Sequence, residues 1–90
     1  AFMYILYSAK LNKYYVGSCI NMERRLYEHN IGHSSFTSRG IPWIIKHTEF
    51  FEELLLAKQR EMYIKRMKSR KYIESRFEAK VPGGLVRVIY

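Results

Sequence analysis

Two apolar runs near the start of the chain flank a short polar segment. Residues 2–7 are apolar or aromatic without a break, which is typical of a strand buried on both faces. Residues 14–20 are rich in aromatic and β-branched side chains and predict a second strand. Because residues 8–13 between them are short and polar, they predict a turn. We therefore expect a β-hairpin that carries Tyr4 on one strand and Tyr15 on the other.

The pattern beyond the hairpin predicts three helices and one more strand. The helices are expected over about 22–31, 52–67 and 69–79, and the strand over 43–51. Asn21 is a good N-cap for the first helix. The apolar spacing in that helix predicts a buried stripe of Met22, Leu26 and Ile31.

The third strand completes a small sheet. Strict alternation in it would put Ile45 on the face of His47 and Ile44 on the opposite face. The element order β-β-α-β-α-α predicts an α+β domain, with a three-stranded mixed or antiparallel sheet flanked by helices. We expect this domain to span residues 1–80. Residues 81–90 would form a C-terminal tail or short strand, with a turn at Pro82-Gly83-Gly84.

Composition limits the class of partner. Sixteen Lys or Arg residues against eight Asp or Glu give a net charge of +8 on 90 residues, which favours nucleic acid or an anionic membrane surface. No apolar run approaches the ~20 residues that a membrane span needs. No predicted helix combines a large exposed apolar face with this charge, so we expect a nucleic-acid partner and no membrane. Cys19 is the only cysteine, which fits a reducing, cytoplasmic location.

Several basic positions are candidates for contact with a phosphate backbone. One lies in the predicted hairpin turn, one on the first helix, one in the loop 32–42, which is rich in Gly, Ser and Thr, and the rest at the junction of the last two helices. Gly17 joins them because its missing Cβ permits a close approach by a backbone or a ligand. The candidates are Lys13, Gly17, Arg24, Arg39, Lys65, Lys68, Arg70 and Lys71. The alternative for the lysines and arginines is a solvated basic face.

Three further residues have spacing that suggests chemistry. Arg25 and His29 are four residues apart, so both project from one helix face; the alternative is a basic surface face with a solvated histidine. Glu61 interrupts an otherwise apolar stripe on the second helix, and a buried carboxylate needs a partner. That partner is either an arginine, such as Arg25 or Arg60, or a divalent metal ion with water and substrate phosphate as its other ligands.

These residues together resemble the GIY-YIG nuclease family. The two name-giving tripeptides appear as Phe2-Met3-Tyr4 and Tyr15-Val16-Gly17, and Arg25 follows Tyr15 by ten residues with His29 one turn later. Glu61 lies in the A-x-x-x-E context of the family's metal-binding glutamate. The first tripeptide keeps only its tyrosine, and residues 73–76 lack the asparagine found in some members. The chain is therefore most similar to small stand-alone bacterial members and to the N-terminal domain of the nucleotide-excision-repair nuclease.

The resemblance implies metal-dependent hydrolysis of phosphodiester bonds. Glu61 would hold one Mg²⁺ or Mn²⁺ ion, and Arg25 would bind the scissile phosphate. Either Tyr4 or His29 would be the general base, while Tyr15 would bind the phosphate or orient Tyr4. We expect DNA as substrate, low sequence specificity, a role in repair or recombination, and targeting through a protein partner. The alternative is a nucleic-acid-binding module that cleaves only with a partner or not at all.

Overall fold

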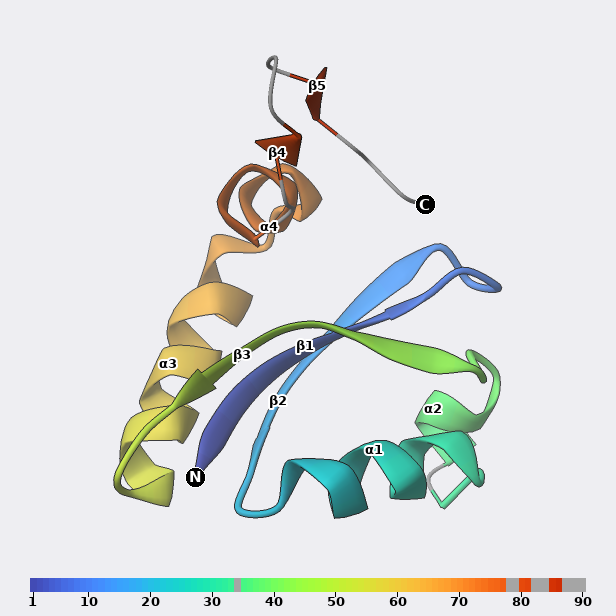
Figure 1. The fold of residues 1–90 in the computed structure, drawn as a ribbon, viewed down its shortest axis with the longest axis horizontal. Coiled ribbons are helices and arrows are strands. Elements are labelled where there is room, and N and C mark those ends of the chain that lie inside the picture. The colour runs from blue at the N-terminus through green and yellow to red at the C-terminus, as the bar shows by residue number, and fades with distance from the viewer. Residues whose placement is uncertain (34, 78–79, 82–84, 87–90) are drawn as a thin grey trace.

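A computed structural model describes residues 1–33, 35–77, 80–81 and 85–86 of the chain (Figure 1). The strands are β1 (Phe2–Ser8), β2 (Lys13–Cys19), β3 (Trp43–Phe50), β4 (Lys80–Val81) and β5 (Leu85–Val86). The helices are α1 (Met22–Asn30), α2 (Ser35–Ser38), α3 (Leu54–Met67) and α4 (Arg70–Phe77). The α+β class and the order β-β-α-β-α-α are confirmed, with the short α2 as an addition.

The central strand of the sheet is β1, which pairs with β2 on one side and β3 on the other, antiparallel to both. The predicted hairpin is confirmed, and its register pairs Tyr4 with Gly17 and Leu6 with Tyr15. Paired residues point to the same face, so Tyr4, Leu6, Tyr15 and Gly17 share one face of the sheet. Met3–Ser8 is buried throughout, as expected for a strand covered on both faces.

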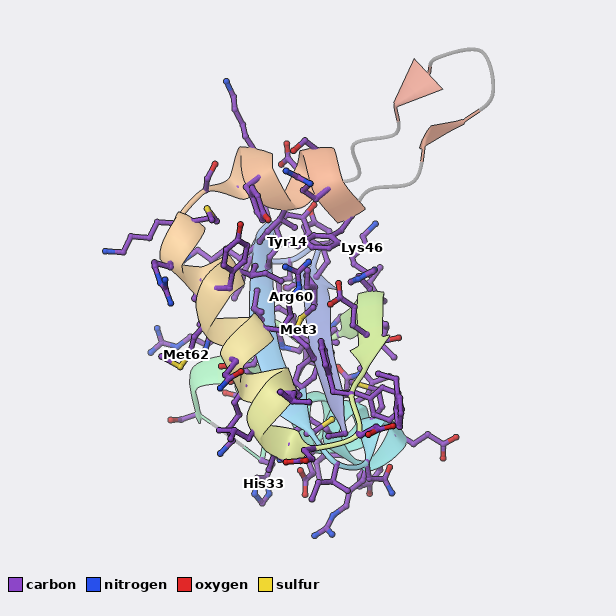
Figure 2. All side chains as sticks on the ribbon, turned by 90° about the vertical axis from the view of Figure 1, so that its left-hand side faces the viewer. Met3, Tyr14, His33, Lys46, Arg60 and Met62 are labelled. Carbon is purple, nitrogen blue, oxygen red and sulfur yellow. The ribbon has the colours of Figure 1, made fainter. Side chains whose placement is uncertain are left out.

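Each face of the sheet has its own apolar cluster. On one face, Met3, Ile5 and Val16 pack against Ile64 of α3 and the partly buried side chains of α4. Figure 1 shows α3 and α4 at that side, and Figure 2 shows Met3 lying behind α3. On the other face, Tyr4, Leu6, Cys19 and Trp43 form the second cluster, and Met22 and Leu26 of α1 pack against it. The sheet therefore lies between α3 and α1.

Three details differ from the sequence expectations. A β-bulge in the β1–β3 pairing shifts the register, so Ile45 lies opposite Leu6 and Ile44 opposite Tyr7; the predicted face assignment of these two isoleucines was therefore wrong. Ile31 is the C-cap of α1 and is 55% exposed, because the helix ends before its side chain can face the sheet. Residues 35–38 form α2 within the predicted loop.

The C-terminal part of the chain is described only in pieces. The last helix is described to Phe77, and residues 78–79, where we expected it to end, lie outside the described residues. The predicted short strand is present as β5, which pairs with β4. The turn expected at 82–84 also lies outside the described residues.

Polar contacts tie α4 and α3 to the sheet. The Arg70 guanidinium donates to the backbone oxygen of Asn12 at 2.7 Å and to its side-chain oxygen at 2.6 Å. Asn12 has a left-handed backbone with φ of 54° in the hairpin turn. On β3, Glu49 accepts hydrogen bonds from Arg60 of α3 at 3.0 Å and pairs with His47 at 2.8 Å. Burial favours a higher pKa for the Glu49 carboxyl, but these two partners outweigh it and hold the pKa below its ordinary value. Among the described helices, none has the length and apolar character to cross a bilayer.

Candidate active site

The site begins with the contact between Tyr4 and Gly17 on neighbouring strands. A Cβ at Gly17 would lie 2.4 Å from the Tyr4 hydroxyl oxygen and 2.5 Å from Cζ. No other residue type would leave room for the phenol ring in its present place. The close approach that we expected at Gly17 is therefore made by Tyr4, a side chain of this same domain. The fixed ring points its hydroxyl toward α1.

The first helix supplies the partner of that hydroxyl. Asn21 caps α1 as predicted, since its side-chain oxygen accepts from the Arg24 backbone N–H at 3.0 Å. From this start, His29 in the last turn faces the sheet and is buried. Its Nε2 lies 3.1 Å from the Tyr4 hydroxyl oxygen, within hydrogen-bonding distance. Two of the five predicted catalytic residues thus touch directly.

Tyr15 completes an aromatic group around this hydrogen bond. Its ring stacks with Tyr4 at 6.4 Å between centroids and meets His29 edge-on at 4.9 Å. The neighbouring cavity of about 260 Å³ is lined by Tyr15, Arg25, Glu28, His29 and His33. The structure therefore brings Tyr4, Tyr15, Arg25 and His29 together, four residues that were predicted from separate segments.

Burial acts on the two hydrogen-bonded groups in opposite directions. It raises the pKa of the Tyr4 hydroxyl, and Tyr15 raises it further. The charge and hydrogen bond of Arg25 lower this pKa but do not cancel the rise. Burial lowers the pKa of His29, and the charge of Arg25 lowers that pKa further. Near neutral pH the imidazole is therefore uncharged, and one of its nitrogens can accept a proton.

Arg25 lies at the mouth of the cavity. Its Nε is 3.3 Å from a carboxylate oxygen of Glu28, and its side chain is 42% exposed. The neighbouring Arg24 pairs with the other oxygen of Glu28, also at 3.3 Å. Arg25 also interacts with the Tyr4 hydroxyl by charge and by a hydrogen bond. Because the guanidinium is partly exposed, it can exchange these contacts for a phosphate, for which its planar fork is well suited.

Glu61 lies at the opposite side of β2, on α3. One carboxylate oxygen accepts a hydrogen bond from the Ser18 hydroxyl at 2.7 Å, and the other accepts one from the Lys65 ammonium at 2.5 Å. The arginine partner considered in the sequence analysis was wrong, because Arg60 pairs with Glu49 and Arg25 with Glu28. Ser18 directly follows Gly17, so Glu61 is joined to the strand that carries the tyrosine site. Within the described ranges, no hydrogen bond or ion pair links Glu61 to Tyr4, Tyr15, Arg25 or His29.

Glu61 offers carboxylate oxygens to a divalent cation. Its carboxylate is 19% exposed, and a cation that binds the oxygen paired with Lys65 has to displace that ammonium. The ligand atoms are oxygens, which Mg²⁺ and Mn²⁺ prefer. In the part of the chain that the structure describes, no group of three or more His, Cys, Asp or Glu side chains could hold a metal. Glu61 would therefore bind such an ion with water and a substrate phosphate as the remaining ligands.

The other basic candidates are dispersed over the surface. Lys13 and Arg39 line a larger cavity next to the site, whereas Lys68, at the C-cap of α3, and Lys71, on α4, are exposed beyond it. Arg70 is engaged by Asn12 and by Glu74, at 2.8 Å. Arg70 therefore links α4 to the hairpin turn through its hydrogen bonds to Asn12.

Two residues at the site were not found by sequence reasoning. Ser18 positions Glu61, and a small hydroxyl residue after Gly17 on an edge strand was the only signal for it. Trp43 forms a wall of the larger cavity, although its place at the start of β3 suggested only a strand residue.

Comparison with known proteins agrees with this geometry. The profile of the GIY-YIG catalytic domain matches residues 1–73. The chain belongs to the GIY-YIG family. A UPF0213 protein of Halobacterium salinarum is 38% identical over 55 residues, which cover 60% of this chain and 71% of the relative. No solved structure matches the chain at a significant level.

Membership fixes the coarse function. GIY-YIG domains form a nuclease superfamily whose members generally depend on divalent metal ions, so this is a nuclease-type domain and nucleic acid is its class of partner. The site residues expected from the sequence lie on β1, β2, α1 and α3, all within the matched range. This GIY-YIG domain thus combines a hydrogen-bonded Tyr–His pair with an arginine at one cavity and a carboxylate across the edge strand.

Proposed function

We propose that this chain is a divalent-metal-dependent endonuclease that hydrolyses phosphodiester bonds in nucleic acid, with DNA as the expected substrate. The main support is the hydrogen bond between Tyr4 and His29 beside Arg25. It places a proton acceptor and an anion-binding group at one cavity, as the hydrolysis of a phosphodiester requires.

The Tyr4–His29 pair would remove a proton from the attacking water. Tyr4 is fully buried and does not line the cavity, so Arg25 has to move off the Tyr4 hydroxyl before water can reach it. The water proton would then pass to the Tyr4 oxygen while the Tyr4 hydroxyl proton passes to His29 Nε2. The water oxygen bonds to phosphorus as the bond to the 3′ oxygen breaks. A free Tyr4 phenolate is disfavoured by the raised pKa of this hydroxyl, whereas the lowered pKa of His29 keeps its imidazole neutral. The pair as a unit is therefore the base, with His29 as the final acceptor.

Arg25 and Tyr15 would hold the phosphate. Arg25 exchanges its contact with Glu28 for the non-bridging phosphate oxygens, whose charge grows in the transition state. Tyr15, stacked on Tyr4 and lining the same cavity, keeps the Tyr4 ring in line with the phosphate.

Glu61 would hold Mg²⁺ or Mn²⁺, with its orientation set by Ser18. When bound, such an ion neutralises charge on the phosphate and on the leaving oxygen. Lys65 has to release its carboxylate oxygen for this, and its ammonium then becomes available to a nearby phosphate.

The test compares the wild type with Glu61→Gln on labelled single-stranded, duplex and branched DNA, with Mg²⁺, with Mn²⁺ and with chelator. We expect metal-dependent cleavage in the wild type and a loss of at least a hundredfold in Glu61→Gln, with binding retained. Glu52→Gln is the matched control, because it removes one exposed carboxylate just before the same helix and should cleave normally.

Other outcomes separate the alternatives. Equal cleavage by Glu61→Gln and the wild type would overturn the metal-ligand role. Salt-sensitive binding without metal-dependent cleavage of any DNA would identify a binding module, or a domain that needs a partner to cleave. The same assay with RNA decides between the two kinds of nucleic acid.

A further inference from the structure

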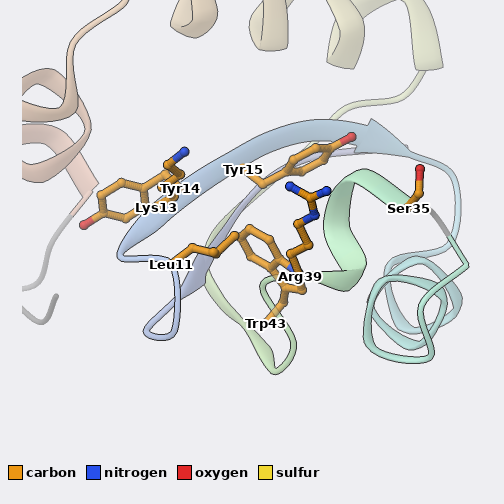
Figure 3. Close-up of a pocket in the computed structure, with 7 residues that line it drawn as sticks. All are labelled: Leu11, Lys13, Tyr14, Tyr15, Ser35, Arg39 and Trp43. Atoms are coloured by element: carbon orange, nitrogen blue, oxygen red, sulfur yellow. The ribbon is translucent and has the colours of Figure 1, made fainter.

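A second cavity lies on the far side of Tyr15 from the candidate active site. Its volume is about 450 Å³, within the range of small-ligand sites. Figure 3 shows the residues that surround it, drawn from the hairpin, from α2 and the end of that helix, and from the start of β3. They are Leu11, Lys13, Tyr14, Tyr15, Ser35, Arg39 and Trp43.

The floor of this cavity is firmly built. Trp43 is only 4% exposed, and its indole N–H donates to the Thr37 backbone oxygen at 2.7 Å. The Asn30 side chain bonds both backbone groups of Trp43, at 2.6 and 3.1 Å. A Cβ at Gly40 would lie 2.4 Å from the indole, so the glycine permits this packing. These contacts fix the position of the indole at the floor of the cavity.

The walls and rim differ in chemistry. Half-buried Tyr15 and Leu11 present ring and aliphatic surface, whereas the Tyr14 ring packs on the other face of the sheet. At the rim, Lys13 and Arg39 are exposed, and in the described part of the chain neither makes an ion pair. Arg39 extends from the end of α2 toward the ring of Tyr15 (Figure 3). An aromatic wall with a cationic rim is the combination that binds an unstacked base together with its phosphate.

We propose that this cavity takes one unstacked nucleobase of the strand being cleaved, next to the phosphate held by Arg25. This inference rests on the proposed function. Tyr15 supports it because the same side chain lines both cavities, so a strand that crosses Tyr15 places neighbouring nucleotides in each. The favoured substrate class is then nucleic acid that is single-stranded or unpaired at the point of cleavage, since a base in a duplex would first have to leave its stack at a cost in free energy.

Trp43 provides the measurement, because it is the only tryptophan and lines the cavity. Glu61→Gln protein would be titrated with a short single-stranded DNA and with an abasic strand of equal length and charge. We expect a change in Trp43 fluorescence and about tenfold tighter binding for the strand that carries bases. A blunt duplex should bind without the fluorescence change. A free nucleoside monophosphate should bind far more weakly than the strand.

Ser35→Phe tests the cavity directly. The added ring should fill the space beside Tyr15 and remove the preference for bases, while affinity for the abasic strand stays the same. Ser75→Phe adds the same ring at an exposed position on α4 and should keep the preference. If Ser35→Phe fails to fold, the comparison of base-containing and abasic strands still decides.

The outcomes separate this inference from the proposed function. Equal affinity for base-containing and abasic strands, with unchanged Trp43 fluorescence, would overturn the base site and leave the nuclease proposal standing. A free nucleotide that binds as tightly as the strand would replace it with a mononucleotide site. A clear base preference without metal-dependent cleavage would uphold the cavity and overturn the nuclease. Absence of all nucleic-acid binding would overturn both.

Discussion

Tyr4 and His29 share a hydrogen bond in a buried setting that disfavours the charged form of each. A tyrosine with a raised pKa is a weaker candidate for a free base than the sequence suggests, and a histidine with a lowered pKa is a better one at neutral pH. The two proposals for the base therefore differ in their dependence on pH.

If His29 is the final proton acceptor, cleavage should be nearly constant above about pH 6.5 and fall at lower pH. The reason is that protonation removes the acceptor, and the pKa of His29 lies below its ordinary value of 6.5. Single-turnover rates between about pH 5 and pH 9 measure this. A rate that instead keeps climbing to the highest pH measured would identify a Tyr4 phenolate as the base, because the pKa of this hydroxyl is raised above its ordinary value. His33→Asn, in the same cavity, should move the midpoint upward, because the charge of His33 is one of the causes that lower the pKa of His29.

Gly17→Ala should disturb the site through a single methyl group. The new Cβ would overlap the Tyr4 ring, so the ring must move and its bond to His29 must lengthen. We expect a loss of about 1–3 kcal/mol in unfolding free energy, measured in urea, and a loss of activity that exceeds it. Val16→Ala, one residue earlier and on the other face, should lower stability by a similar amount but retain the cleavage rate of the folded protein. Full activity in Gly17→Ala would show that the position of Tyr4 is not critical.

At the scale of elements, β2 joins two halves of the site. Its Tyr15 and Gly17 face α1, and its Ser18 reaches Glu61 on α3. The edge position of β2 in the sheet makes this possible, because the carboxylate can approach from beside the strand.

Ser18→Ala should weaken metal binding without unfolding the domain. The loss of the hydroxyl that orients Glu61 is expected to reduce apparent metal affinity about 10- to 100-fold, as is usual for groups that hold a ligand in place. The Mn²⁺ dependence of the cleavage rate measures it, with Ser75→Ala as the control hydroxyl deletion. An unchanged metal dependence would mean that Glu61 is positioned by α3 alone.

The sequence predicted the elements better than their contacts. The unbroken apolar run predicted β1, and Asn21 predicted the start of α1. Both predictions were possible because these side chains act on the backbone next to them. Residues 35–38 have no apolar period, so α2 was not detectable, and the β-bulge depends on pairing with β1. The grouping of Tyr4, Tyr15, Arg25 and His29 followed from the family resemblance. The Ser18–Glu61 bond needed the structure, because nothing local links positions 43 residues apart.

At the scale of the whole molecule, the net charge is +8. At the larger cavity, Lys13 and Arg39 make no ion pair with any residue that the structure describes. Several candidate cations have internal contacts, since Arg24, Lys65 and Arg70 each pair with a carboxylate. The exposed candidates that make no ion pair within the described part of the chain are Lys13, Arg39, Lys68 and Lys71.

Binding to duplex DNA should therefore depend steeply on salt. If these four cations each neutralise one phosphate, affinity should fall roughly a hundredfold between about 50 and 200 mM salt. Fluorescence anisotropy at several salt concentrations gives the slope, and Lys71→Ala should reduce it by about one unit while Lys58→Ala should not. A slope near zero would mean that the phosphate backbone contributes little.

The central place of β1 has a consequence for hydrogen exchange. Its amides are bonded to strands on both sides and covered by helices on both faces, so they should exchange only when the whole domain unfolds. Helix α3 leaves Leu55, Met62 and other apolar side chains exposed, and Met62 points away from the sheet (Figure 2). Its amides should exchange sooner, through local opening. The Tyr4–His29 pair would then persist in partly opened molecules in which Glu61, the proposed metal ligand, has already left its place. Such molecules would hold nucleic acid without cutting it.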